Sequence, residues 1–366
     1  MGPLSVRGWR LVLFLLALVS VNTTTAHADA IDDFLRAEMH QRKIPGLALA
    51  VVRNGAVVKL EGYGLANLEH DVPVTPATVF ELASVTKPIT AAAVMALVED
   101  GKVRLDTPIT TYLRGAPDTW RDVTTRHLLT HTSGLPTLEA DFAGAGMEDI
   151  RLRYSTARLF GMVTRESTPS RPGARFQYND VGYFLLGMII EHVTGKRYAE
   201  FLDERFFRPL GMASTSVLDQ ARIVKHRAAG YTLQDGRLVN IRRVVDVELP
   251  SFFGVLSSAR DLATWLIALT GGRVVTPASL AQMWTPARLN DGTTDTYGFG
   301  WYLGEQHGRR MVWHRGITGT EVSLFPDDGL IVVVLTNLGR QVGGTDPVNA
   351  WGLTSAVAER YLVRPQ

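Results

Sequence analysis

The two ends of this chain are patterned as β-strands, whereas its long middle is patterned as helices. Near the start, residues 46–65 form two apolar runs joined by Asn54-Gly55, and Asn-Gly in this setting is the strongest short signal for a hairpin. From Tyr297 onward, short β-branched or aromatic runs are separated by glycines, at residues 298–303, 310–314, 321–325 and 330–336. Strands at both ends imply that the two termini build one sheet together.

Helical patterns occupy the segment between these two groups of strands, and one more follows the last strand. They cover residues 125–130, 156–164, 181–193, 199–206 and 259–269, and a closing helix is predicted after Pro347, over residues 348–362. We therefore expect an α+β fold, with an antiparallel sheet built from both chain ends, flanked by helices, and an inserted, mostly helical lobe. One catalytic domain over residues 29–366 would contain an α/β lobe (29–105 with 290–366) and a helical lobe (106–289).

The first 28 residues have the pattern of a secretory signal. Arg7 and Arg10 precede an apolar run over residues 11–21, and Ala26-His27-Ala28 is a small-residue cleavage site, with a competing cut after Ala30. The apolar run is too short for a stable membrane span. We expect an exported protein, periplasmic or extracellular, with a retained N-terminal anchor as the alternative.

The composition excludes several kinds of chemistry. The chain has no cysteine, which removes disulfides, thiol nucleophiles and thiolate metal sites. It carries 38 basic and 36 acidic residues, and removal of the signal with its two arginines leaves the charge balanced. Nothing in this balance indicates nucleic acid or an anionic membrane as a partner. The expected partner is a small-molecule or peptide substrate, and the oligomeric state is not indicated.

The motif Ser84-Val85-Thr86-Lys87 places a hydroxyl and an amine three residues apart, where an alanine-rich helical pattern begins. Positions i and i+3 share one face of a helix. A lysine that is unprotonated could take the serine proton and make the oxygen a nucleophile. The motif by itself is also compatible with a helix start that carries a solvated lysine.

Two further motifs contain groups that could assist such a serine. Tyr178-Asn179-Asp180 lies at a predicted helix entrance, where Tyr178 could relay a proton. Asp180 could bond the lysine or a substrate amide, or it could cap the helix. His314-Arg315-Gly316 ends a predicted strand, and its glycine allows a ligand close to the backbone. His314 would line that strand as a hydrogen-bond donor or a partial cation. Backbone N–H groups there and at the serine could stabilise an oxyanion.

These three motifs, in this order, resemble the serine hydrolase superfamily of class C β-lactamases, DD-peptidases and family VIII esterases. The signature there is Ser-x-x-Lys, then Tyr-x-Asn, then Lys-Thr-Gly or His-x-Gly, a relative of the class A pattern. The resemblance covers residues 31–362 and implies a penicillin-binding-protein-like transpeptidase fold. Further landmarks lie at residues 129–136, 176–187, 209–212, 258–262, 297–301 and 335–337.

Carried over position by position, the resemblance implies a role for each motif residue. Ser84 would be the acylated nucleophile and Lys87 its base. Tyr178 would be the proton shuttle to the leaving group and, later, the activator of the hydrolytic water. His314 stands where the family has a lysine. The backbone N–H of Ile317, which follows the motif glycine, would pair with that of Ser84 as the oxyanion hole. No metal or cofactor is implied.

Two departures from the family pattern bear on the substrate. Asp180 replaces the usual asparagine and adds a carboxylate that would favour the ammonium form of Lys87. His314 replaces a lysine and removes a permanent charge that could hold a substrate carboxylate. Both changes favour an esterase or a D-amino-acid peptidase over an efficient β-lactamase.

Other function classes have weaker support in the sequence. His127 and His131 lie four residues apart and could share a helix face as metal ligands, but no His-Glu-x-x-His accompanies them. The sequence also lacks a Gly-x-Ser-x-Gly elbow, a phosphate-binding loop and a Gly-x-Gly-x-x-Gly motif. One alternative stays open, a catalytically weak homologue that binds cell-wall peptide or a partner protein.

Overall fold

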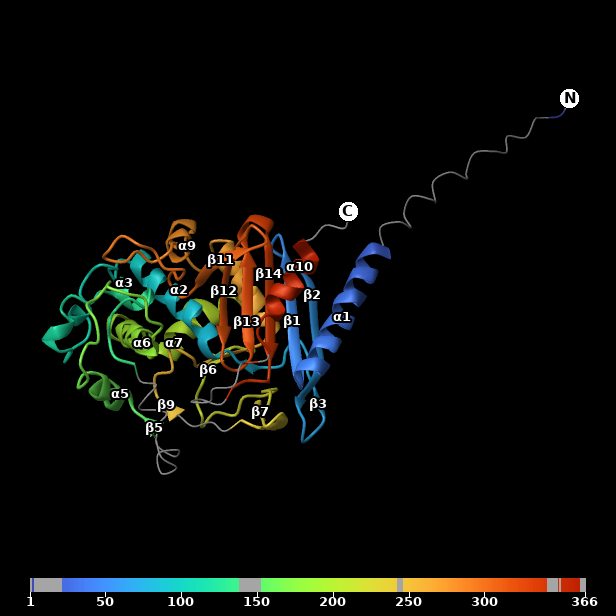
Figure 1. The fold of residues 1–366 in the computed structure, drawn as a ribbon, viewed down its shortest axis with the longest axis horizontal. Helices are drawn as coiled ribbons and strands as arrows, with labels where there is room; N and C mark the ends of the chain where they lie inside the picture. Colours follow the sequence, from blue (N-terminus) through green and yellow to red (C-terminus); the bar gives the residue numbers. More distant parts are fainter. Residues whose placement is uncertain are drawn as a thin grey trace.

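The computed structural model of the protein describes residues 2, 22–137, 153–241, 246–340, 348 and 350–362 (Figure 1). Its centre is an antiparallel sheet in the strand order β11-β12-β13-β14-β1-β2-β3. The strands are β11 (Tyr302–Gln306), β12 (Arg309–Gly316), β13 (Thr320–Phe325), β14 (Leu330–Thr336), β1 (Gly46–Arg53), β2 (Ala56–Asn67) and β3 (Val72–Pro73). The N-terminal β1 pairs with the C-terminal β14 from Leu47 opposite Thr336 to Arg53 opposite Leu330. The predicted sheet built from both chain ends is confirmed.

Alternate residues of β1 serve two cores, one on each face of the sheet. Leu47, Leu49 and Val51 join the cluster that contains α1 (Asn22–Arg42) and α10 (Leu353–Leu362). Ala48, Ala50 and Val52 join the larger cluster on the other face, against α8 (Ala259–Thr270). Because successive strand residues point to opposite faces, a strand covered on both sides becomes apolar at every position.

The helix that follows the serine motif is buried on all sides. Helix α2 (Thr86–Glu99) has every residue from Thr86 to Leu97 buried. It packs against α6 (Asp180–Thr194), which in turn packs against α3 (Thr125–Leu129). A helix that is apolar all round belongs inside the protein. This position holds the first turn of α2 firmly between the sheet and the helices on the left of Figure 1.

The middle of the chain contributes short elements around these helices. They are α5 (Thr156–Val163), α7 (Tyr198–Leu202), α9 (Pro277–Met283), and the strands β4 (Phe80–Glu81), β5 (Arg153–Tyr154), β6 (Ser216–Val217), β7 (Tyr231–Gln234), β8 (Arg237–Asn240), β9 (Asp246–Val247) and β10 (Val255–Ser257). Strands β4, β10 and β6 form a small sheet beside the serine motif. The predicted α+β fold with helices in its middle is therefore confirmed.

Several predicted boundaries were wrong. The strand predicted over residues 298–303 begins only at Tyr302, because Gly298 N–H bonds to Trp301 O and Gly300 takes a φ of +79°, which together make a turn. The closing helix begins at Leu353 instead of residue 348, since Gly352 has a φ of +88° that a helix cannot contain. Helix α7 ends at Leu202 and continues as a π-helical turn over Asp203–Phe207.

The predicted signal lies mostly outside the described residues and stays a prediction. Helix α1 includes residues 22–28 of the predicted signal and extends to Arg42. The sequence analysis did not predict this helix. Within the part of the chain that the structure describes, no helix is both long enough and apolar enough to cross a membrane.

Candidate active site

Ser84 lies in a single 3-10 turn, Ala83–Val85, directly before α2. The preceding Ala83 has a φ of +46°, in the left-handed region that is costly for a residue with a β-carbon. A neighbouring strand holds this strained entry, because Thr320 Oγ1 donates to Leu82 O at 2.8 Å. The serine is thus displayed on a backbone that the surrounding sheet fixes in place.

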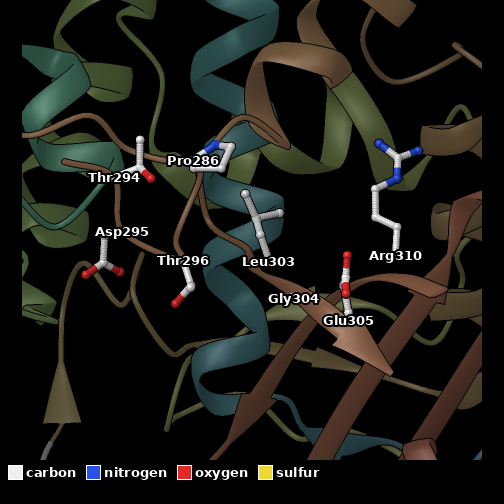
Figure 2. A pocket seen from close by; sticks show the side chains of 8 residues that line it. All are labelled: Pro286, Thr294, Asp295, Thr296, Leu303, Gly304, Glu305 and Arg310. Carbon is white, nitrogen blue, oxygen red and sulfur yellow. The ribbon is translucent and has the colours of Figure 1, made fainter. Parts of the chain in front are cut away.

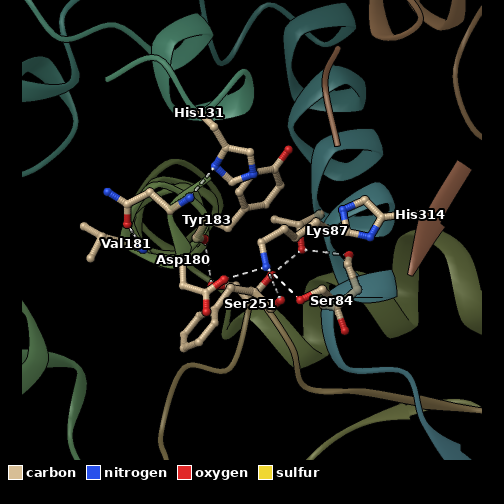
Figure 3. Close-up of polar contacts among 12 residues, drawn as sticks. Ser84, Lys87, His131, Asp180, Val181, Tyr183, Ser251 and His314 are labelled. Carbon is tan, nitrogen blue, oxygen red and sulfur yellow. Dashed lines mark hydrogen bonds and ion pairs between the residues drawn. The ribbon is translucent and has the colours of Figure 1, made fainter. Parts of the chain in front are cut away.

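Lys87 is fully buried, and its amine has three oxygen neighbours, as Figure 3 shows. Nζ lies 3.2 Å from Ser84 Oγ, 3.0 Å from Phe252 O and 2.6 Å from Asp180 Oδ1. An ammonium has three donors and can satisfy all three. A neutral amine has two donors, for the carbonyl and the carboxylate, and keeps its lone pair for the serine hydroxyl. The same geometry therefore accommodates both protonation states of Lys87.

Tyr178 stands at the entrance of α6, next to the buried amine. The centre of its ring lies 4.8 Å from Lys87 Nζ, a distance at which a cation is attracted to the ring face. The ring also contacts His131, with 4.4 Å between the ring centres. The second motif is therefore brought to the Ser84 and Lys87 pair.

Asn179, and not Asp180, caps α6, so the capping role considered for Asp180 is wrong. The Asn179 side chain accepts the N–H of Val181 at 2.9 Å, and its amide donates to the carbonyls of residues 135 and 136, each at 2.9 Å. Asp180 is the first helical residue and its carboxylate is turned toward Lys87. Asn179 therefore anchors the loop before α6, and the Asp180 carboxylate is free of the capping role and pairs with the Lys87 amine.

His131 also lies in the site. The sequence analysis had considered this residue as a possible metal ligand and had given it no other role. Its Nδ1 accepts the N–H of Asn179 at 3.1 Å, so its hydrogen is on Nε2. Burial, together with the charge of Lys87, places the pKa of His131 well below its usual value and keeps the ring neutral. The possible metal partner, His127, instead receives the N–H of Thr124 at the start of α3. The two histidines thus have separate structural partners.

His314 lies on β12 and is 1% exposed. Its Nδ1 donates to Arg315 O at 3.0 Å, because a carbonyl can only accept, and its Nε2 accepts from Tyr297 Oη at 3.1 Å. Burial, then the nearby charge of Lys87, lowers the pKa of His314 well below its usual value. A neutral ring with both nitrogens engaged does not supply the partial cation that the sequence suggested.

Gly316 brings the end of β12 against the serine segment. A β-carbon added there would lie 2.3 Å from Leu82 O and 3.1 Å from the Ala83 β-carbon. Only glycine permits this approach. Ile317, the predicted oxyanion residue, follows directly in the chain. All three motifs therefore surround Ser84 Oγ and Lys87 Nζ.

Sequence reasoning missed the Phe252 carbonyl and Tyr297, both of which contact motif side chains. Every residue has a backbone carbonyl, so residue type could not have identified Phe252 as the acceptor. Tyr297 stands in a Tyr-Gly-Phe-Gly-Trp run that had been noted only as a landmark. A hollow with a volume of about 320 Å³ lies beside β11 (Figure 2). None of the three motifs lines it.

The sequence comparison decides the family. A family model described as beta-lactamase matches residues 31–351. The chain belongs to the beta-lactamase family. Among solved structures, this family member resembles the D-amino acid amidase from Ochrobactrum anthropi SV3, with a TM-score of 0.78 and 27% identity, over 92% of this chain and 97% of the amidase. The predicted superfamily is confirmed.

Curated relatives of this beta-lactamase family member are longer than it is. Protein flp from Staphylococcus aureus (strain MRSA252) is 26% identical over 324 residues, which are 85% of this chain and 63% of that protein. The unguisins hydrolase ungD' from Aspergillus campestris is 31% identical over 353 residues, 87% of this chain and 64% of that protein. The chain thus spans just under two thirds of the length of these relatives.

Proposed function

We propose that this protein is a serine hydrolase that works through an acyl-enzyme on Ser84. The observation that carries the proposal is the 3.2 Å contact between Ser84 Oγ and a Lys87 amine with no exposed surface. A serine hydroxyl within hydrogen-bond reach of a positioned amine is the arrangement that an activated nucleophile requires.

In the first step, neutral Lys87 takes the Ser84 proton while Oγ attacks the substrate carbonyl carbon. The carbonyl π electrons move to oxygen and give a tetrahedral oxyanion. The N–H groups of Ser84 and Ile317 would stabilise this charge. When the oxyanion collapses, the bond to the leaving group breaks, and the leaving atom takes a proton relayed through the Tyr178 hydroxyl. Water, activated by Tyr178, then attacks the acyl-enzyme ester carbonyl, and the bond to Ser84 Oγ breaks. The acid product leaves, and the proton taken from water returns to Ser84 Oγ.

We propose a substrate without a carboxylate beside the scissile bond, such as a small ester or the amide of a D-amino acid. His314 is neutral and both of its nitrogens are engaged, so it offers no charge for an anion. Arg315 stacks on Trp351, with its Cζ atom 4.1 Å from the ring centre, on the opposite face of the sheet. The likeness to a D-amino acid amidase supports this substrate class. D-Amino-acid peptides and β-lactams commonly carry that carboxylate, so we expect both to be poorer substrates. This narrows the sequence-based expectation, which had favoured D-amino-acid peptides together with esters.

The Asp180 ion pair favours a second candidate function. A carboxylate 2.6 Å from Lys87 Nζ stabilises the ammonium, which cannot act as a base. The site would then bind a cell-wall peptide or a partner protein with little turnover.

Labelling separates the two candidates. A fluorophosphonate probe should modify the wild-type protein and fail to modify Ser84→Ala of equal thermal stability. A panel of p-nitrophenyl esters, D-phenylalanine amide, D-alanyl-D-alanine and nitrocefin then ranks the substrates. Absence of labelling in well-folded wild type would favour the binding protein, and a preference for nitrocefin would contradict the neutral-substrate proposal.

We also propose that the protein is exported, on the basis of its basic and apolar N-terminal residues. Mass spectrometry of the protein recovered outside the cytoplasm tests this. The expected N-terminus is Asp29, or Ile31 if the competing site is cut.

A further inference from the structure

The carbonyl of Gly316 is held by an indole on the face of the sheet away from His314. Trp351 Nε1 donates to Gly316 O at 2.9 Å. Gly319 N–H donates to the same oxygen at 3.0 Å and closes the turn after β12. A carbonyl oxygen has two lone pairs, and here each has a donor.

This carbonyl belongs to the peptide group whose N–H is that of Ile317. A peptide group is planar, and in its trans form the C=O and N–H point in opposite directions. A donor that fixes the direction of Gly316 O therefore also fixes the direction of Ile317 N–H. A hydrogen bond accepted by the carbonyl also polarises the peptide and strengthens its N–H as a donor.

The Trp351 ring is itself held in place. Arg315 Cζ lies 4.1 Å from the centre of the Trp351 ring and 5.2 Å from that of Trp313, so the guanidinium contacts both indoles. Such cation–π contacts fix a ring through its faces. A stacked ring keeps its N–H in a single direction, which a freely rotating side chain would not do.

The backbone beside Trp351 is anchored as well. Glu321, directly opposite Arg315 on β13, accepts the N–H groups of Gly352 at 3.0 Å and Thr354 at 3.2 Å. The Glu321 carboxylate thus joins the start of α10 to β13, which pairs with β12, the strand that ends at Gly316. The indole and its acceptor thus belong to one connected unit.

We propose that Trp351 is a positioning residue for the oxyanion hole, which it orients through the Gly316–Ile317 peptide group. The inference rests on the proposed serine hydrolase function. An oxyanion donor accelerates reaction only when it is aimed at the place where charge develops. Loss of the indole N–H should therefore weaken binding of the tetrahedral state and leave ground-state substrate binding almost unchanged.

The test compares Trp351→Phe with Trp313→Phe in the full-length protein. Both variants truncate an indole that contacts Arg315, but only the first removes a donor to Gly316. We expect Trp351→Phe to lower kcat on a p-nitrophenyl ester about tenfold, on the scale of a weakened oxyanion contact. KM should change less than twofold, and phenylboronic acid, which forms a tetrahedral adduct on serine, should lose affinity by the same factor as kcat. Trp313→Phe should lower the unfolding temperature similarly and change kcat by less than threefold.

Equal kcat and equal boronate affinity in the two variants would overturn the inference. If Trp351→Phe does not fold, benzothienylalanine at position 351 preserves the ring shape and replaces the N–H by sulfur, with the same expected losses. An inactive, unlabelled wild type would overturn the proposed function and this inference together. An active wild type with an unaffected Trp351→Phe would overturn the inference alone.

Discussion

Asp180 Oδ1 lies closer to Lys87 Nζ, at 2.6 Å, than Ser84 Oγ does, at 3.2 Å. The aspartate is about one third exposed, whereas the lysine has no exposed surface. The pair therefore joins the buried amine of Lys87, the proposed base, to the solvent-exposed side of the site.

Replacement of Asp180 by asparagine should increase turnover at neutral pH. The amide keeps the size of the side chain and removes the charge that favours the ammonium form of Lys87. We expect kcat/KM at pH 7 to rise about tenfold, with the acidic limb of the pH–rate profile displaced to lower pH. Asp203→Asn, which removes a carboxylate paired with an exposed arginine, is the control. A profile that coincides with that of the wild type would refute this effect of the carboxylate.

Tyr178→Phe should lower kcat about a hundredfold, the usual scale for loss of a general acid or base. Phenylalanine preserves the ring that contacts His131 and Lys87, so stability should change little. Steady-state kinetics and thermal unfolding measure the two effects separately. Tyr112→Phe, which removes a hydroxyl bonded to Arg104 N–H outside the site, serves as the matched control. Near-normal turnover in Tyr178→Phe would exclude the proton relay.

The stability of the protein should fall as the pH falls below about 6.5. Burial lowers the pKa values of His131 and His314 in the folded state, so below about pH 6.5 the unfolded chain binds protons that the folded chain does not. Between pH 7.5 and 5.5 each histidine should lower the free energy of unfolding by about 1 kcal/mol. Urea titrations of wild type and His314→Asn at both pH values measure the difference. Equal losses in the two proteins would show that His314 is charged in the folded state.

Gly316→Ala should disrupt both the fold and the site. The new methyl group would lie 2.3 Å from Leu82 O, so β12 must move away from the serine segment. We expect a loss of about 1–3 kcal/mol in the free energy of unfolding, typical of an overpacked site, and at least a tenfold loss of kcat. Gly304→Ala on the adjacent β11 meets nothing within 4 Å and is the matched control. Similar stability and turnover in both variants would contradict the close approach.

Local patterns in the sequence were sufficient for the sheet and for the first motif. The apolar, β-branched runs at both ends and the spacing of Ser84 and Lys87 depend on residues near one another in the chain. The sequence did not predict the turn at Gly300 or the left-handed conformation of Gly352, because glycine allows these conformations without requiring them.

Residue type alone did not decide the environment of each motif residue. Whether Asn179 or Asp180 capped α6 depended on carbonyls more than forty residues away. The neutral state of His314 depended on its burial and on Tyr297.

By itself, the sequence determined the two-ended sheet, the helix after the serine motif and the hydroxyl–amine pair at its start, since these follow from residues close together in the chain. Only the tertiary structure decided which carboxylate meets Lys87, which charge His314 carries and which indole holds Gly316 O. The physical reason is that hydrogen bonds and desolvation act between neighbours in space, and those neighbours come from segments far apart in the chain.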